Sequence, residues 1–204
     1  FFVCSSLTRV SIPSSVVSIG SYSFRNCSSL KQIIIPSSVT SIDNYAFMNC
    51  SLLAKITIPS SVTSIGEGVF NGIKSLIIEG DIQHITNSMF KGCSTLTHIS
   101  IPPFVTSIDE DAFFSCSSLT QISIPSSVIS IGSCAFKNCS SLMQIIIPSS
   151  VTSIGSHAFR NCSSLTQISI PSSVTSIGEG AFKGIKSLII EGDIQHILNN
   201  MFRG

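Results

Sequence analysis

Seven cysteines recur along the chain at a regular step, and a thiol is the side chain here best suited to binding a metal or forming a cross-link. The step is 23 residues in most places, which excludes the short spacing of a zinc site or a Cys-x-x-Cys redox pair. We interpret these cysteines as a column of small buried thiols. Disulfides between neighbouring repeat units are the alternative. The column consists of Cys4, Cys27, Cys50, Cys93, Cys116, Cys139 and Cys162. Cys134 lies outside it and is expected to be more exposed and open to oxidation.

Histidine, serine and aspartate are all present, so a hydrolase triad must be considered. His84 and His196 are the same residue in two copies of one unit, and His98 takes a position that elsewhere holds glutamine. Because no histidine has a serine or aspartate setting unlike those of its repeat neighbours, we assign no catalytic residue and expect no enzyme.

Carboxylates gather around residues 67–111, where Glu67, Asn87 and Glu110 share one position of the repeat. Oxygen ligands of this kind could hold calcium weakly. A solvated acidic patch is the simpler interpretation, and we assign no metal site and no cofactor.

Four asparagines precede Cys-Ser and so match the N-x-S glycosylation signal: Asn26, Asn49, Asn138 and Asn161. In a protein secreted by a eukaryote they could carry glycans. The alternative, which we favour, is that asparagine serves the turn before a strand.

The chain has 11 Lys and Arg residues against 10 Asp and Glu residues. This balance lacks the excess of positive charge that is typical of proteins that bind nucleic acid. Mean hydropathy is +0.50. However, the apolar residues come in short runs, far below the ~20 consecutive residues of a transmembrane helix. We therefore expect a repeated hydrophobic core and no transmembrane segment in this sequence.

One phrase, IPSSVTSIG, stands unchanged at residues 58–66, 147–155 and 170–178. The leucine that follows Cys-Ser-Ser recurs mostly every 23 residues, and a shorter unit containing GIKSLIIEGDIQHI occurs twice. The sequence thus predicts a single repeat domain over 1–204, which we expect to be a segment of a longer array. Its nine predicted units are 4–26, 27–49, 50–72, 73–92, 93–115, 116–138, 139–161, 162–184 and 185–204.

Within one unit, Leu165, Ile168 and Ile170 have the spacing of a short strand with one buried face. Pro171 ends that strand, and the serines after it suit a turn. Val174 and Ile177 are expected to point inward on the return side, and the Ala-Phe pair at 181–182 to lie on a single helical turn. One unit buries too little apolar surface to fold alone, so stability must arise between stacked units.

The phrase L-x-x-I-x-I-P-x-x-V-x-x-I-G-x-x-A-F-x-x-C resembles the BspA-like class of leucine-rich repeats over essentially the whole chain. The resemblance implies a β-rich α/β solenoid: a right-handed coil with one parallel strand per unit on a concave sheet, and a short second strand and a helical turn on the convex side. It further implies a non-catalytic protein-binding module at the cell surface or outside the cell. The partner would be a host, matrix or neighbouring-cell protein, or a copy of the chain itself. A structural rod that stacks end to end, including an intracellular scaffold, is the alternative.

Solenoids commonly bind partners on the concave sheet, so the outward positions of the strands there are the candidate site. Aligning the units places Lys55 beside Ser75, and His98 in one column with Gln121. The candidate partner-binding residues are Arg9, Gln32, Ile34, Lys55, His98, Gln121, Gln144, Ile146, Gln167 and Lys186.

Overall fold

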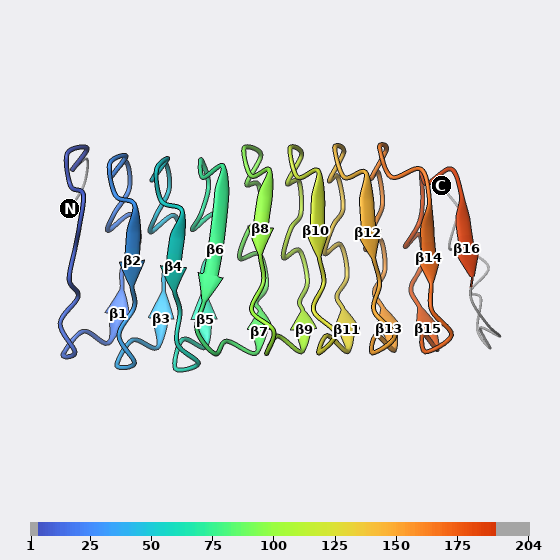
Figure 1. The fold of residues 1–204 in the computed structure, drawn as a ribbon, viewed down its shortest axis with the longest axis horizontal. Coiled ribbons are helices and arrows are strands. Elements are labelled where there is room, and N and C mark those ends of the chain that lie inside the picture. The colour runs from blue at the N-terminus through green and yellow to red at the C-terminus, as the bar shows by residue number, and fades with distance from the viewer. Residues whose placement is uncertain (1–3, 191–204) are drawn as a thin grey trace.

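The chain winds into a solenoid whose coils follow one another in a nearly straight row (Figure 1), in a computed structural model that describes residues 4–190. From residue 27 to residue 184, each coil carries one longer strand and one strand of two residues. The longer strands are β2 (Gln32–Ile34), β4 (Lys55–Thr57), β6 (Ser75–Glu79), β8 (His98–Ser100), β10 (Gln121–Ser123), β12 (Gln144–Ile146), β14 (Ile168–Ile170) and β16 (Leu188–Ile190). The short strands are β1 (Ser18–Ile19), β3 (Ser41–Ile42), β5 (Ser64–Ile65), β7 (His84–Ile85), β9 (Ser107–Ile108), β11 (Ser130–Ile131), β13 (Ser153–Ile154) and β15 (Ser176–Ile177).

All pairings between these strands are parallel and join successive coils. The longer strands form the sheets β2-β4-β6-β8, β10-β12 and β14-β16, which together make a surface that we call the strand face. The short strands form β1-β3-β5 and β7-β9-β11-β13-β15 on the return side. Gln121 pairs with Gln144 and Ser130 with Ser153, so one step of the sequence repeat equals one turn of the coil. The predicted parallel solenoid is confirmed. The predicted ninth unit lies largely outside the described residues.

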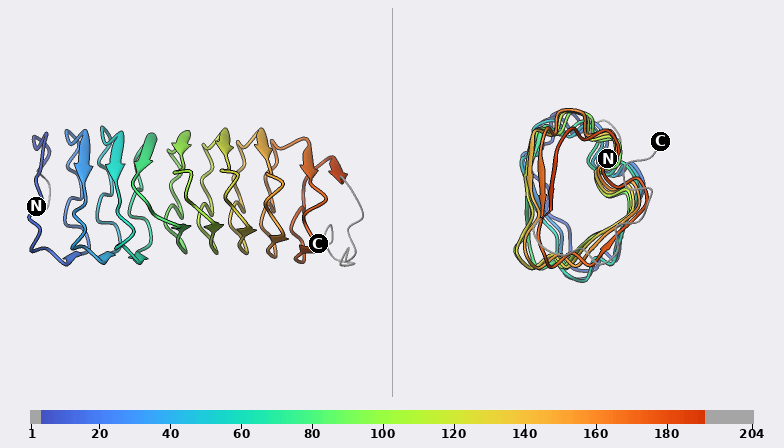
Figure 2. Two further views of the ribbon diagram at one scale, coloured as in Figure 1. Left: turned by 60° about the horizontal axis from the view of Figure 1, so that its bottom comes forward. Right: turned by 90° about the vertical axis from the view of Figure 1, so that its right-hand side faces the viewer.

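Viewed along the solenoid axis, the coils lie one over another and enclose an interior (Figure 2, right), and the core side chains form columns along this axis. Eight phenylalanine rings run along it from Phe24 to Phe182, with neighbouring ring centroids 5.0–6.1 Å apart. Leucine, isoleucine, valine, alanine and cysteine columns surround the rings, and the described residues include no buried polar or charged side chain. Each coil covers the open face of the next, which is how short units that cannot fold alone acquire a core.

The Pro-Ser-Ser-Val segment between the two strands is a hydrogen-bonded turn. In one coil the Val174 N–H donates to the Pro171 carbonyl at 3.1 Å. The Ser173 hydroxyl donates to the Val151 carbonyl of the preceding coil at 2.8 Å. The serines therefore both suit the turn, as expected, and tie one coil to the next.

The prediction of a helical turn around the Ala-Phe pair is wrong, because residues 4–190 contain no helix. The segment instead alternates two kinds of hydrogen bond. The N–H groups of Cys134, Phe136 and Asn138 each donate at 2.8 Å to carbonyls of the next coil, whereas the Lys137 N–H donates to the Cys134 carbonyl at 3.0 Å. Cys134 and Asn138 have φ of 54° and 63°, which interrupts the uniform right-handed backbone that a helix requires.

The first short unit shifts the register of the strand face. Lys55 of β4 pairs with Ile77 of β6, two residues beyond the predicted Ser75. A two-residue shift keeps the same side chains facing inward. Gly80 ends this strand at φ 109°, where a Cβ would meet the Ile58 carbonyl oxygen of the coil before it. At the next pairing the expected register returns, with Ser75 beside His98.

Candidate functional site

The ten candidate residues on the strand face are all exposed. Alternation along each strand accounts for this, since Gln144 and Ile146 flank the inward-facing Ile145. Ile146 is 80% exposed and Ile34 66%, which is unusual for large apolar side chains. The prediction of which side chains point outward is thus confirmed, whereas their role in binding stays a prediction.

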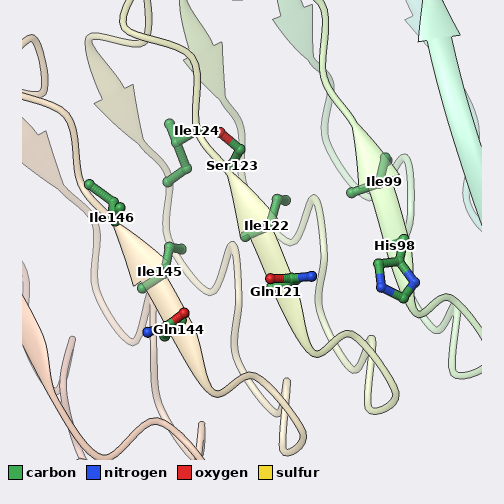
Figure 3. A pocket seen from close by; sticks show the side chains of 9 residues that line it. All are labelled: His98, Ile99, Gln121, Ile122, Ser123, Ile124, Gln144, Ile145 and Ile146. Carbon is green, nitrogen blue, oxygen red and sulfur yellow. The ribbon is translucent and has the colours of Figure 1, made fainter.

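The structure brings four of the candidates together in one open hollow over β8, β10 and β12 (Figure 3). The hollow has a volume of about 430 Å³, and the candidates that line it are His98, Gln121, Gln144 and Ile146. Its polar side chains are two amides, one imidazole and the hydroxyl of Ser123, and no carboxylate lines it. The chemistry available is hydrogen bonding around an apolar contact.

Three further candidates line a second hollow nearer the first coil. Arg9, Gln32 and Ile34 border a volume of about 500 Å³ there. Gln167 and Lys186 lie farther along the strand face and line neither hollow.

Lys55 takes part in an ion pair that the sequence did not predict. Its Nζ lies 2.8 Å from Oε1 of Glu79, and the Thr57 hydroxyl contacts Oε2 of the same carboxylate at 3.4 Å. The shifted register of the short unit creates this contact, because it places Thr57 beside Glu79. Both charged side chains are nearly half exposed, so we expect the pair to contribute little to stability.

One histidine does have a distinctive setting, contrary to the prediction from the repeat. Nδ1 of His84 lies 2.7 Å from Oγ of Ser107, and that hydroxyl donates to Oδ1 of Asp109 at 2.6 Å. Because the serine proton points to the carboxylate, the imidazole must donate to Ser107 rather than remove its proton. The arrangement is therefore the reverse of a Ser-His-Asp nucleophile. A signal was available in the sequence, since Ser107 follows His84 by one repeat length.

The cysteine column is buried, as predicted, with Cys4 at its end only partly buried, and all eight cysteines are free thiols. Sγ of Cys139 lies 3.1 Å from the Phe113 carbonyl oxygen of the preceding coil, and Cys50, Cys116 and Cys162 make equivalent bonds at 3.0–3.1 Å. Burial raises the pKa of Cys50 and of Cys162 to about 12. The alternative of disulfides between units is not realised. Cys134 is partly buried and its pKa is also raised, chiefly by burial, which disfavours the reactive thiolate.

The acidic patch is partly used in contacts between coils. Asp111 accepts a bond from Nζ of Lys91 at 3.1 Å, and this contact raises the pKa of the lysine. Among residues 4–190, no group of three or more histidine, cysteine or acidic side chains could hold a metal ion.

Asp81 holds the turn of the preceding coil. The backbone N–H and the hydroxyl of Ser60 donate to its carboxylate at 2.6 and 2.9 Å, and these bonds lower the pKa of Asp81. A lowered pKa means that the unfolded chain takes up this proton first as the pH falls. We expect the stabilising contribution of Asp81 to be present above about pH 4 and to be lost below it. An NMR titration of the Asp81 carboxyl checks that its pKa is lowered. Asp81→Asn should make the free energy of unfolding depend less on pH in the acidic range. An Asp81 pKa above the ordinary value would contradict the assignment.

The four N-x-S asparagines occupy turn positions with a left-handed backbone, at φ 60–63°. Nδ2 of Asn49 donates to Oδ1 of Asn26, and Asn161 donates likewise to Asn138, both at 3.0 Å. Their role in the turn is as we interpreted it. Their amides additionally link neighbouring coils, and a glycan on Asn49 or Asn161 would change the nitrogen that makes the link.

The repeat also matches a known protein family. The family described as "BspA type Leucine rich repeat region (6 copies)" matches residues 1–120 and 106–204. The chain belongs to the BspA-type leucine-rich repeat family. This family points to a role in protein interaction or as a scaffold, and its fold is generally non-enzymatic.

Solved structures of bacterial leucine-rich repeat proteins have the same fold. One is a leucine-rich repeat protein from Bacteroides ovatus, 29% identical with a TM-score of 0.51 over 84% of this chain and 57% of that one. Another is the pneumococcal vaccine antigen PcpA, 23% identical with a TM-score of 0.51 over 88% of this chain and 50% of that one. This chain thus spans about half the length of each of these two proteins. A search of curated proteins found no match.

In the described part of the chain, no helix has the length and apolar character needed to cross a bilayer.

Proposed function

We propose that this BspA-type repeat segment is a protein-binding module at the cell surface, and that it holds its partner on the strand face. The partner is a protein of the host, of the matrix or of a neighbouring cell. The observation that carries the proposal is Ile146, an 80% exposed isoleucine at the edge of a hollow lined by His98, Gln121 and Gln144. An exposed apolar side chain ringed by hydrogen-bonding groups is the pattern of a protein contact.

Neighbouring residues extend this apolar surface. Met143, in the same coil as Ile146, is 57% exposed, and Ile189 on β16 is 44% exposed. Ser123 and Ser169 flank Ile146 and Ile189 in the sheet. Small polar neighbours leave the isoleucines standing above the sheet, where a partner can cover them.

A test changes Gln121, Gln144, Ile146 and Lys186 to alanine together and measures binding to immobilised matrix proteins and to cultured cells. Losing one apolar anchor and three polar contacts should weaken binding about tenfold or more. The matched control changes the return side, with Ile129→Ala, Thr152→Ala and Thr175→Ala, all exposed positions. Binding that is unaffected by the first variant, or equally reduced by both, would refute the strand face as the site.

The scaffold alternative makes a different prediction for the same proteins. A rod that assembles with copies of itself should show sedimentation that depends on concentration, and the strand-face variant should not change it. Self-assembly without binding to any matrix protein or cell would replace the adhesion proposal.

A further inference from the structure

A column of basic side chains runs along the turn side of the later coils. It is the residue after the core phenylalanine, and its basic members in these later coils are Lys91, Lys137, Arg160 and Lys183, with Arg25 at the same position in the first coil. Phe114 fills the position between Lys91 and Lys137. The last three cations belong to consecutive coils, so they are about one strand spacing, ~4.8 Å, apart along the rod.

A groove runs along the positions that directly follow this column in the chain. The residue after each basic side chain lines the groove, and in the coils of Lys91, Lys137 and Arg160 the serine two positions further on lines it too. It has a volume of about 690 Å³ and is lined by Gly92, Ser94, Ser115, Ser117, Asn138, Ser140, Asn161, Ser163 and Gly184. Serines, asparagines and glycines from successive coils thus border an open groove, and no carboxylate is among the lining residues.

Charge is also divided along the rod, although the chain as a whole is nearly neutral. Residues 64–115 hold six carboxylates against two lysines, whereas residues 133–190 hold three lysines and one arginine against one glutamate. The basic column therefore lies mostly in a region of positive charge, which attracts anions over about a Debye length.

Most of the basic groups are not neutralised by the protein. Lys91 is paired with Asp111. In the described part of the chain, Lys137, Arg160 and Lys183 have no carboxylate within 4.0 Å, and Nε of Arg160 is shielded from solvent without a hydrogen-bond acceptor. All three side chains are partly buried.

We propose that this groove binds a linear anionic polysaccharide, with its acidic groups on Lys137, Arg160 and Lys183 and its hydroxyls on the serines and asparagines. Such a polymer carries acidic groups at short regular intervals. From Lys137 to Lys183, the basic column likewise presents one cation in each successive coil. The site is distinct from the strand face and does not depend on the proposed protein partner.

Single-stranded nucleic acid fits the groove less well. Proteins that bind it combine cations with aromatic rings on which bases stack. The aromatic ring beside this groove is Phe114, and the ammonium groups of Lys91 and Lys137 lie 5.5 and 5.4 Å from its centroid. The ring is thus already engaged by cations, whereas the hydroxyl and amide lining suits sugar hydroxyls.

The test measures binding of the full chain to heparin, which is sulfated, to polygalacturonate, which is carboxylated, and to neutral dextran. The triple variant Lys137→Gln, Arg160→Gln and Lys183→Gln should weaken binding to the preferred anionic polymer about tenfold or more. Raising the salt from about 0.05 to 0.5 M should weaken it as well. The two anionic polymers show whether sulfate or carboxylate is preferred.

The matched control removes the same charge from the strand face, with Lys31→Gln, Lys74→Gln and Lys186→Gln, all exposed. This control should keep binding within about threefold of the original chain, and thermal unfolding should confirm that both variants fold. Three outcomes would overturn the proposal: no binding to either anionic polymer, equal losses in the two variants, or binding of single-stranded oligothymidylate that is as tight and as sensitive to the groove variant.

Discussion

Replacing Phe136 by alanine is expected to lower the free energy of unfolding by about 3–5 kcal/mol. The ring is fully buried and lies between two others, with centroids 5.2 Å from Phe113 and 5.3 Å from Phe159. Its removal leaves a cavity shared by two coil interfaces, and it also removes two stacked contacts. Because stability in a solenoid arises between neighbours, this one change weakens both interfaces of its coil.

Denaturant titration monitored by circular dichroism measures the effect. Phe136→Leu should cost clearly less, since it refills most of the cavity. Phe104→Ala is the matched surface control, because Phe104 is 61% exposed, and it should change stability by no more than about 0.5 kcal/mol. A loss below about 1 kcal/mol for Phe136→Ala would show that the phenylalanine column is not a continuous part of the core.

The solenoid could be predicted because each unit repeats both its length and its inward-facing residues. Leu165, Ile168 and Ile170 indicate a strand by their spacing, and a repeat of constant length puts equivalent strands side by side. The turn around the core phenylalanine could not be predicted in the same way. Ala-Phe is compatible with a helix, and what excludes one is the left-handed backbone at Cys134 and Asn138. That backbone is held by bonds to the next coil, which local sequence preferences do not describe.

The outward residues of the strand face were predictable because alternation alone decides which side chains point out. The contacts that these residues make were harder to predict. Lys55 meets Glu79 because the short unit shifts the register by two residues, and a shift that preserves the inward pattern leaves no trace in the sequence. The link from His84 to Ser107 differs, since the repeat length alone places these residues on neighbouring coils. Comparing the return-side columns would have revealed it.

The chain is also expected to lose stability steeply in alkali, because six thiols of the cysteine column are buried and four of these have a strongly raised pKa. Burial raises the pKa of Cys50 and Cys162 to about 12, and raises that of Cys116 and Cys139 well above the ordinary value of 9.0. Above that ordinary value the unfolded chain releases these protons while the folded chain keeps them. The contribution of each thiol is therefore complete below about pH 9 and is lost as the pH rises toward the folded pKa. One thiol accounts for about 1.4 kcal/mol per pH unit, so four account for about 5 kcal/mol per unit.

Urea titrations at several pH values between about 8 and 11, with a reductant present, measure this slope. Cys139→Ala removes one of the four titrating groups, so it should reduce the slope by about 1.4 kcal/mol per pH unit even though it lowers stability at neutral pH. Cys134→Ala is the matched control, because Cys134 is only partly buried and should contribute much less to the slope. Ionisation of tyrosine and lysine is common to all three proteins and cancels in the comparison. A slope that Cys139→Ala leaves unchanged would mean that the thiols already ionise in the folded chain, and hence that the coils do not close over the cysteine column as tightly as its hydrogen bonds to the phenylalanine carbonyls indicate.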